Sequence, residues 1–224
     1  MSDEFAQDLA RMALVLHEQA DVEQTAERFL EYVLARIGAD HASVVLVQRG
    51  GRLESAAATD ALVEEADRLQ LEAGEGPTFS AIEQETSVVS GDTANDSRWP
   101  TWSAGIVPVG LRSVLTVRLR TPTTTVGALN LFDPAKNRFT KADDAVAQVF
   151  ADHAAVAVAN ARSESTLWQA IDARKLIGQA QGILMERFDL TDEQAFAVLR
   201  RYSQDNNVKL REVAQRLIHT RKLS

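Results

Sequence analysis

The chain of 224 residues is long enough for two domains, and its apolar share of 45% is ordinary for a globular protein. It contains no cysteine, which excludes disulfides, thiolate metal sites and a cysteine nucleophile and fits a cytoplasmic protein. The net charge of −8 is divided unevenly, because residues 1–160 carry −11 and residues 161–224 carry +3. This asymmetry indicates an acidic module joined to one that meets a polyanion.

A membrane segment and a metal centre are not expected. No apolar run approaches the length of a membrane-spanning helix, and the acidic first residues do not resemble a signal peptide. The histidines show no paired spacing such as His-x-x-x-His, so no metal, haem or other cofactor is indicated. They are His17, His41, His153 and His219.

The first 140 residues predict helices followed by an antiparallel sheet. Residues 5–37 show helical spacing that ends at Gly38, and strand patterns with turn signals follow. The further elements are a hairpin of strands 43–48 and 53–59 around Gly50–Gly51, helical pieces 60–70 and 76–84, a short strand 87–89, a loop, and a hairpin of strands 113–119 and 125–132. This order predicts an antiparallel sheet with its helices gathered on one side.

Short motifs in this region carry a family resemblance. They are Gly74-Glu75-Gly76-Pro77 before a helix, Arg98-Trp99-Pro100 in the loop, Gly127 to Phe132 on a strand, and Asn137-Arg138-Phe139 with Asp143-Asp144 opening a helix. Residues 22–161 therefore resemble a GAF domain, a small-molecule sensor fold. The last motif resembles one of cyclic-nucleotide-binding relatives, but Thr140 as N-cap with Asp143 at the third helical position accounts for the same letters, and we favour this structural interpretation.

A sensor implies a pocket for a small molecule or a surface for a protein partner, neither of which the sequence identifies. Such a pocket is mostly apolar and lined by aromatic residues. Trp99 and Trp102, in the loop before strand 113–119, are the candidate ligand-binding residues. The alternative, that the two rings cap the core, stays equally open.

From Thr140 to Phe188 the helical pattern continues without a flexible linker. Steps of three and four residues give a mostly apolar heptad seam, which predicts a homodimer paired through this helix. The candidate dimer residues are Val146, Val149, His153, Val156, Asn160 and Leu167. Asn160 can fix the register of a paired helix, or it can be a polar break in contact with solvent.

Residues 167–223 show three short amphipathic helical stripes rich in Arg and Lys. Apolar residues recur at helical spacing within 176–188, 195–202 and 210–218. Thr191 and Gln194 predict a capping box before the second helix, and Asn206–Asn207 predict a turn and N-cap before the third. The three stripes can close one small core.

The segments 173–187, 192–203 and 207–214 resemble the ANTAR domain, a three-helix RNA-binding module of bacterial antitermination regulators. The resemblance implies dimers that bind tandem stem-loops in nascent mRNA and prevent a terminator hairpin from forming. The candidate RNA-binding residues are Arg174, Lys175, Gln179, Gln181, Arg187, Arg200, Arg201, Ser203, Lys209 and Arg211. At Gln181 the family commonly has Lys. The alternative for each basic residue is a solvated side chain or one paired with a nearby carboxylate, such as Arg187 with Asp189.

The predicted fold is α+β: a GAF-like antiparallel sheet with helices, joined by a long helix to an all-α three-helix domain. The expected domains are an N-terminal helix (1–21), a sensor (22–161) and an RNA-binding domain (162–224), with helix 140–188 continuous across the boundary. We expect a binding protein rather than an enzyme, because the methionine sulfoxide reduction performed by some GAF-like proteins needs cysteine. A helix-turn-helix that binds DNA, formed around residues 205–207, is the alternative function.

Overall fold

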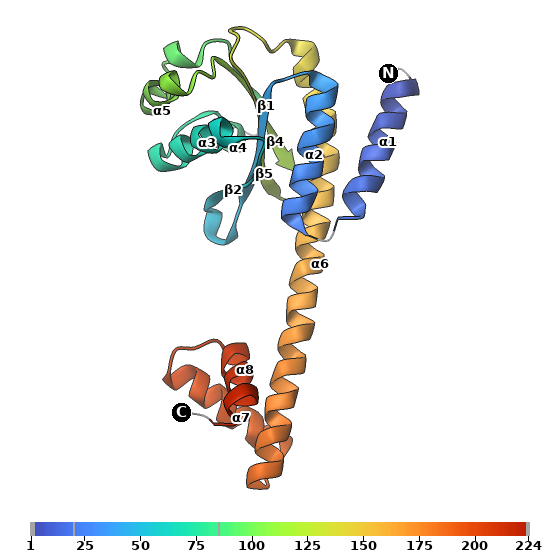
Figure 1. Ribbon diagram of the computed structural model, residues 1–224, viewed down its shortest axis with the longest axis vertical. Helices are drawn as coiled ribbons and strands as arrows, with labels where there is room; N and C mark the ends of the chain where they lie inside the picture. The colour runs from blue at the N-terminus through green and yellow to red at the C-terminus, as the bar shows by residue number, and fades with distance from the viewer. Residues whose placement is uncertain (1–2, 20, 85, 223–224) are drawn as a thin grey trace. The chain divides into compact units, whose positions relative to one another are not determined.

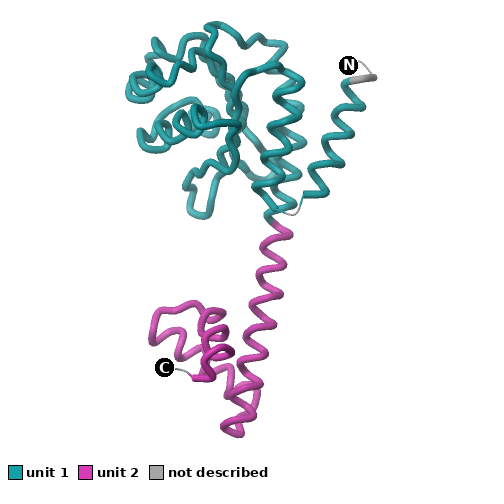
Figure 2. Tube along the Cα trace, viewed as in Figure 1, with its two compact units in different colours: residues 1–162 teal, residues 163–224 magenta. Residues whose placement is uncertain are grey.

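The computed structural model describes residues 3–19, 21–84 and 86–222 (Figure 1). The chain divides into two compact units, residues 1–162 and residues 163–224 (Figure 2). Among the described helices, none combines the length and the apolar character needed to cross a bilayer.

The first unit is built on a five-stranded antiparallel sheet with the strand order β2-β1-β5-β4-β3. The strands are β1 (His41–Val47), β2 (Leu53–Ala58), β3 (Val88–Ser90), β4 (Ser113–Arg120) and β5 (Thr125–Asp133). Both predicted hairpins are confirmed, β1 with β2 and β4 with β5. Gly50 and Gly51 both have φ of 81°, a left-handed conformation that explains the two glycines in the first turn.

In the described part of the first unit, helices α1 to α6 accompany this sheet, and α6 continues into the second unit. They are α1 (Asp3–His17), α2 (Val22–Ile37), α3 (Ala61–Ala73), α4 (Pro77–Glu83), α5 (Pro100–Ile106) and α6 (Lys141–Phe188), with short 3-10 turns at Arg49–Gly51, Thr93–Asn95 and Val107–Val109. The start of α6 confirms the structural interpretation of its motif, because Thr140 Oγ1 accepts a hydrogen bond from the Asp143 backbone N–H at 3.2 Å. Asp143 Oδ2 in turn accepts from the Thr140 backbone N–H at 2.8 Å.

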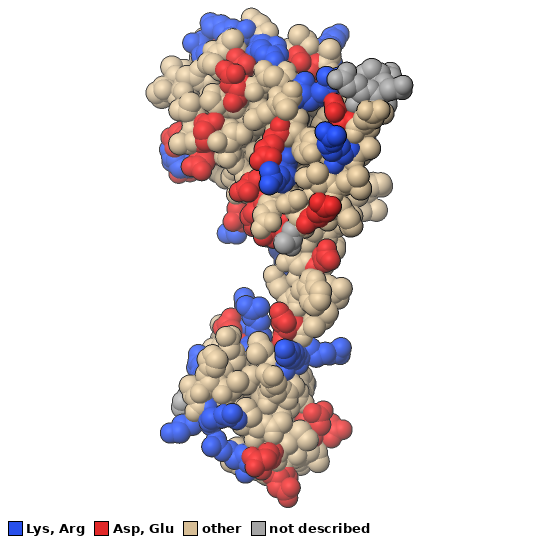
Figure 3. Space-filling model, turned by 45° about the vertical axis from the view of Figure 1, so that its right-hand side comes forward, with Lys and Arg blue, Asp and Glu red and all other residues tan. Residues whose placement is uncertain are grey.

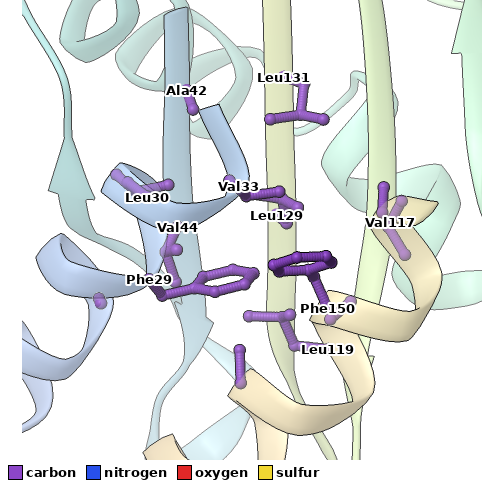
Figure 4. Close-up of a cluster of buried hydrophobic side chains, with 14 of the residues drawn as sticks. Phe29, Leu30, Val33, Ala42, Val44, Val117, Leu119, Leu129, Leu131 and Phe150 are labelled. Carbon is purple, nitrogen blue, oxygen red and sulfur yellow. The ribbon is translucent and has the colours of Figure 1, made fainter. Parts of the chain in front are cut away.

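The helices cover both faces of the sheet, so the prediction that they gather on one side is wrong. On one face, α1, α2 and the first part of α6 pack on Leu115, Leu129 and Leu131, as the close-up of Phe29 and Phe150 illustrates (Figure 4). On the other face, α3 and α5 pack on Val114 and Phe132. This second face also contains buried polar residues, such as Thr116 and Asn130. The order of elements along the chain does not show which face each helix covers.

The second unit consists of the end of α6 with α7 (Asp192–Asp205) and α8 (Leu210–Thr220). Its core contains Ala180, Leu184, Ala195, Leu199, Val213, Ala214 and Leu217. The predicted capping box of α7 is confirmed, with Thr191 Oγ1 accepting from the Gln194 backbone and Gln194 Oε1 accepting from the Thr191 backbone. Asn207 does lie in a turn, with φ of 51°, but the N-cap of α8 is Lys209 and not an asparagine.

Candidate functional site

The predicted basic residues of the second unit all have exposed side chains. They are Arg174 and Lys175 on α6, Arg187 at its end, Arg200 and Arg201 on α7, the N-cap Lys209, and Arg211 on α8. The apolar sides of the three helices close the core, which leaves these cations on the outside. Figure 3 shows basic side chains interspersed with acidic ones on the visible surface of this unit. Such a surface suits a polyanion.

The cations on α7 are available for a partner. The Nε of Arg201 lies 3.6 Å from Asp205 Oδ2, but both side chains are largely exposed, at 85% and 65%. An exposed pair of this kind contributes less than about 1 kcal/mol, so it is exchanged readily for a phosphate. Arg200 is exposed on the same helix.

Three other predicted residues make contacts inside the second unit. Gln181 donates to Asp192 Oδ1 at 2.6 Å and thereby joins α6 to the start of α7. Ser203 Oγ donates to the Val208 carbonyl at 2.6 Å in the turn between α7 and α8. Arg187 donates to the carbonyl of Arg221, the C-cap of α8. Gln179 is exposed on α6. Contact of any of these residues with RNA stays a prediction.

The two candidate ligand-binding tryptophans are buried in the core between the sheet and α5. Trp99 is 3% exposed and Trp102 is 1% exposed, and their rings meet edge to face with centroids 5.7 Å apart. Both indole N–H groups have partners, Ser80 Oγ at 2.8 Å and the Ala66 carbonyl at 3.3 Å. Packing accounts for their positions, and contact with a ligand stays a prediction.

A buried polar cluster under α3 and α4 was missed by sequence reasoning. Asp67 on α3 accepts hydrogen bonds from Ser43 Oγ at 3.0 Å, Ser55 Oγ at 2.9 Å and Asn130 Nδ2 at 3.2 Å. Burial raises the pKa of Asp67 to about 7, which these three hydrogen bonds only partly oppose. The pKa of Asp67 therefore lies close to neutrality.

The cluster extends across the sheet to α4. Asn130 Oδ1 accepts from Thr116 Oγ1 at 2.8 Å and from Thr78 Oγ1 at 2.9 Å. Gln70 Oε1 accepts the Thr78 backbone N–H at 2.9 Å, which satisfies a donor at the start of α4. Hydrogen bonds thus join α3 and α4 to β1, β2 and β5. Because the bonds form one network, a change at one of these elements alters the hydrogen bonds of the others.

The six predicted dimer residues on α6 have different surroundings. Val146 and Val149 are half-buried against the core of the first unit. The remaining four are exposed: His153, Val156, Asn160 and Leu167. Two large apolar neighbours that the heptad pattern missed are also exposed, Trp168 at 60% and Ile171 at 46%. The exposed apolar surface is therefore centred nearer to residues 167–171 than the sequence indicated.

The structure thus combines a domain built on an antiparallel sheet with a helical domain that carries exposed cations. The family matches identify these two parts as the domains of a sensor-regulated regulator. The chain belongs to the GAF domain family, which matches residues 19–159, and it carries a C-terminal ANTAR domain over residues 165–218. The two domains are regulatory and sensory rather than catalytic.

Solved structures agree with the fold of the first unit. The GAF domain of a phosphoenolpyruvate-protein phosphotransferase from Coxiella burnetii is 17% identical with a TM-score of 0.60, over 72% of this chain and 96% of that one. The corresponding domain from Acinetobacter is 14% identical with a TM-score of 0.57, over 73% and 97%. The free methionine-R-sulfoxide reductase of Neisseria meningitidis is 18% identical with a TM-score of 0.56, over 73% and 95%. A comparison with curated proteins found no match.

Proposed function

We propose that this protein is a cytoplasmic transcription antitermination regulator, whose ANTAR domain binds tandem stem-loops in nascent mRNA under the control of the GAF domain. The observation that carries the proposal is the match of residues 165–218 to the ANTAR family, on a unit whose basic side chains are exposed. The excess of cations in residues 161–224 supports it, because Lys and Arg supply most of the sequence-independent affinity for nucleic acid.

Capture of cellular RNA tests this function directly. The protein is crosslinked in cells, purified, and the bound RNA is sequenced; we expect leader transcripts with two adjacent stem-loops. Failure to recover RNA would contradict the proposal. The same transcripts are then compared with duplex DNA of equal length at one salt concentration, since tighter binding to the duplex would favour a helix-turn-helix function.

Replacing Arg200 and Arg201 with Ala is expected to lower the affinity for a captured transcript by on the order of tenfold, because two phosphate contacts are lost. The slope of log affinity against log salt should also become shallower by about 1 to 2. Filter binding at several salt concentrations measures both quantities. The matched control is Arg49→Ala with Arg52→Ala, which removes two exposed arginines from the turn between β1 and β2. An equal loss of affinity in the two double variants would show that net charge matters and that this site does not.

We also propose that two chains associate through the exposed apolar stretch of α6. Leu167 is 61% exposed, and Trp168 and Ile171 adjoin it. Exposure of these three apolar side chains to water is unfavourable, and burial in a contact would stabilise them. Leu167 and Ile171 are four residues apart and share one side of the helix, together with Asn160, as a paired helix requires. A ligand that changes the GAF domain would then alter RNA binding through a coupled equilibrium, with α6 as the connection.

The substitution Leu167→Lys is expected to convert the protein from twice the chain mass to a single chain mass, because it places a charge within the apolar contact. Light scattering during size-exclusion chromatography measures the mass over a range of concentrations. Leu14→Lys is the control, since Leu14 is 68% exposed on α1 and outside the proposed contact. If Leu14→Lys alone separates the chains, the contact lies on α1 and not on α6.

A further inference from the structure

The second unit has a hollow of about 430 Å³ between the end of α6, α7 and the end of α8. Its apolar lining includes Leu184 and Leu217, which are 2% and 1% exposed and belong to the core of the unit. Phe188 and Val198 also line it but are 59% and 38% exposed. Phe188, Val198 and Leu190 thus form an apolar rim that is partly exposed among the described residues, above the buried Leu184 and Leu217.

The remaining two lining residues are arginines. Arg187 lies at the end of α6, and Arg221 is the C-cap of α8. Arg187 donates a hydrogen bond to the Arg221 carbonyl, which holds the two residues together. None of the seven described lining residues is acidic. The hollow therefore combines an apolar lining with two cations.

We propose that this hollow binds an unpaired nucleobase of the RNA, with the base against Phe188 and the flanking phosphates at Arg187 and Arg221. The inference rests on the proposed function and specifies how that function is performed. A nucleotide joins a flat, weakly polar ring to an anion, which matches the two parts of this lining. The hollow is also within the size range of roughly 300–1,000 Å³ that is usual for small-molecule pockets.

The location next to the α7 arginines supports a nucleic-acid occupant. Val198 and Arg201 are three residues apart on α7, so their side chains are neighbours on the surface of the helix. A strand that contacts Arg201 through a phosphate can therefore place a nearby base at Val198. A base held in a helical stem is stacked and paired and does not enter such a hollow, whereas a loop base does. The hollow thus distinguishes stem-loops from continuous duplexes.

The test uses the full chain and a set of RNA hairpins with one fixed stem and a loop of random nucleotides, beside the same stem closed by abasic loop units. Phe188→Leu removes the aromatic ring and keeps an apolar side chain. We expect it to weaken binding of the base-bearing hairpins about tenfold and to leave the weak binding of the abasic hairpin unchanged. Phe196→Leu is the matched control, because Phe196 is a 37%-exposed aromatic residue of α7 that does not line the hollow.

The outcomes separate this inference from the proposed function. Equal loss with both kinds of loop, or no loss with Phe188→Leu while the wild type binds RNA, would overturn the base site and leave RNA binding intact. Binding of no hairpin and no captured transcript by the wild type would overturn both. A change of chain mass caused by Phe188→Leu would show that a second copy of the chain occupies the hollow. Thermal melting of each variant verifies that the loss is not one of folding.

Discussion

Replacing Asp67 with Asn is expected to flatten the pH dependence of the free energy of unfolding between about pH 4 and pH 7. Burial raises the pKa of Asp67 to about 7 in the folded protein, from its ordinary value of 3.8. Within this window the folded protein holds a proton that the unfolded chain has released, so the free energy of unfolding falls as the pH rises. The fall amounts to about 4 kcal/mol and is complete above the folded pKa.

An asparagine at residue 67 is neutral at every pH and can form hydrogen bonds with the same partners. Its oxygen can accept from Ser43 and Asn130, and its amide can donate to Ser55 Oγ, as a protonated Asp67 would. Urea unfolding at pH 5 and pH 8 measures the difference for both proteins. Asp40→Asn, at an exposed carboxylate, should retain the wild-type difference. An unchanged difference in Asp67→Asn would mean that Asp67 stays ionised in the fold.

Trp102→Ala is expected to lower the free energy of unfolding by about 3 to 5 kcal/mol. The ring is 1% exposed, packs against Trp99 and donates to the Ala66 carbonyl, so its removal leaves a cavity and removes a hydrogen bond to α3. Urea unfolding followed by circular dichroism measures the loss.

The control for Trp102→Ala is the same change at Trp168, whose ring is 60% exposed. At low protein concentration, where chains are separate, Trp168→Ala should cost less than about 1 kcal/mol. A loss that grows with protein concentration would point to Trp168 within a contact between chains. If Trp102→Ala itself proved nearly neutral, the tryptophan pair would not be a packing element, and its role as a ligand wall would gain support.

Local signals in the sequence predicted the local structure well. The capping box at Thr191 and Gln194 and the cap of α6 at Thr140 depend on residues three apart, so the sequence alone contains both partners. The two hairpins likewise follow from alternating side chains and short turns. The third helix of the ANTAR domain is instructive, because Asn206 and Asn207 correctly predicted a turn but gave the wrong N-cap.

The sequence patterns could not predict contacts between residues that are far apart in the chain. Asp67 and Asn130 are 63 residues apart, and neither shows a pattern that identifies its partner. Thr116 and Asn130 continue the apolar–polar alternation of β4 and β5 as solvent-facing residues would, yet they are buried under α4. The same limit applies to the candidate site. The position of Arg221 beside Arg187 depends on how α8 packs, and so the hollow could not be inferred from helical stripes.

The unbroken length of α6 limits which insertions the protein can accept. Residues 141–188 form one helix that contains no proline, and its two glycines, Gly178 and Gly182, both lie in the part that belongs to the ANTAR domain. An α-helix turns by about 100° per residue, so inserting one residue near Ala170 would rotate the later side chains of α6 about the helix axis by that angle, whereas seven residues would nearly restore the phase. A flexible tether would tolerate either change. The phase of the side chains along α6 therefore depends on how many residues are inserted, and not only on whether any are.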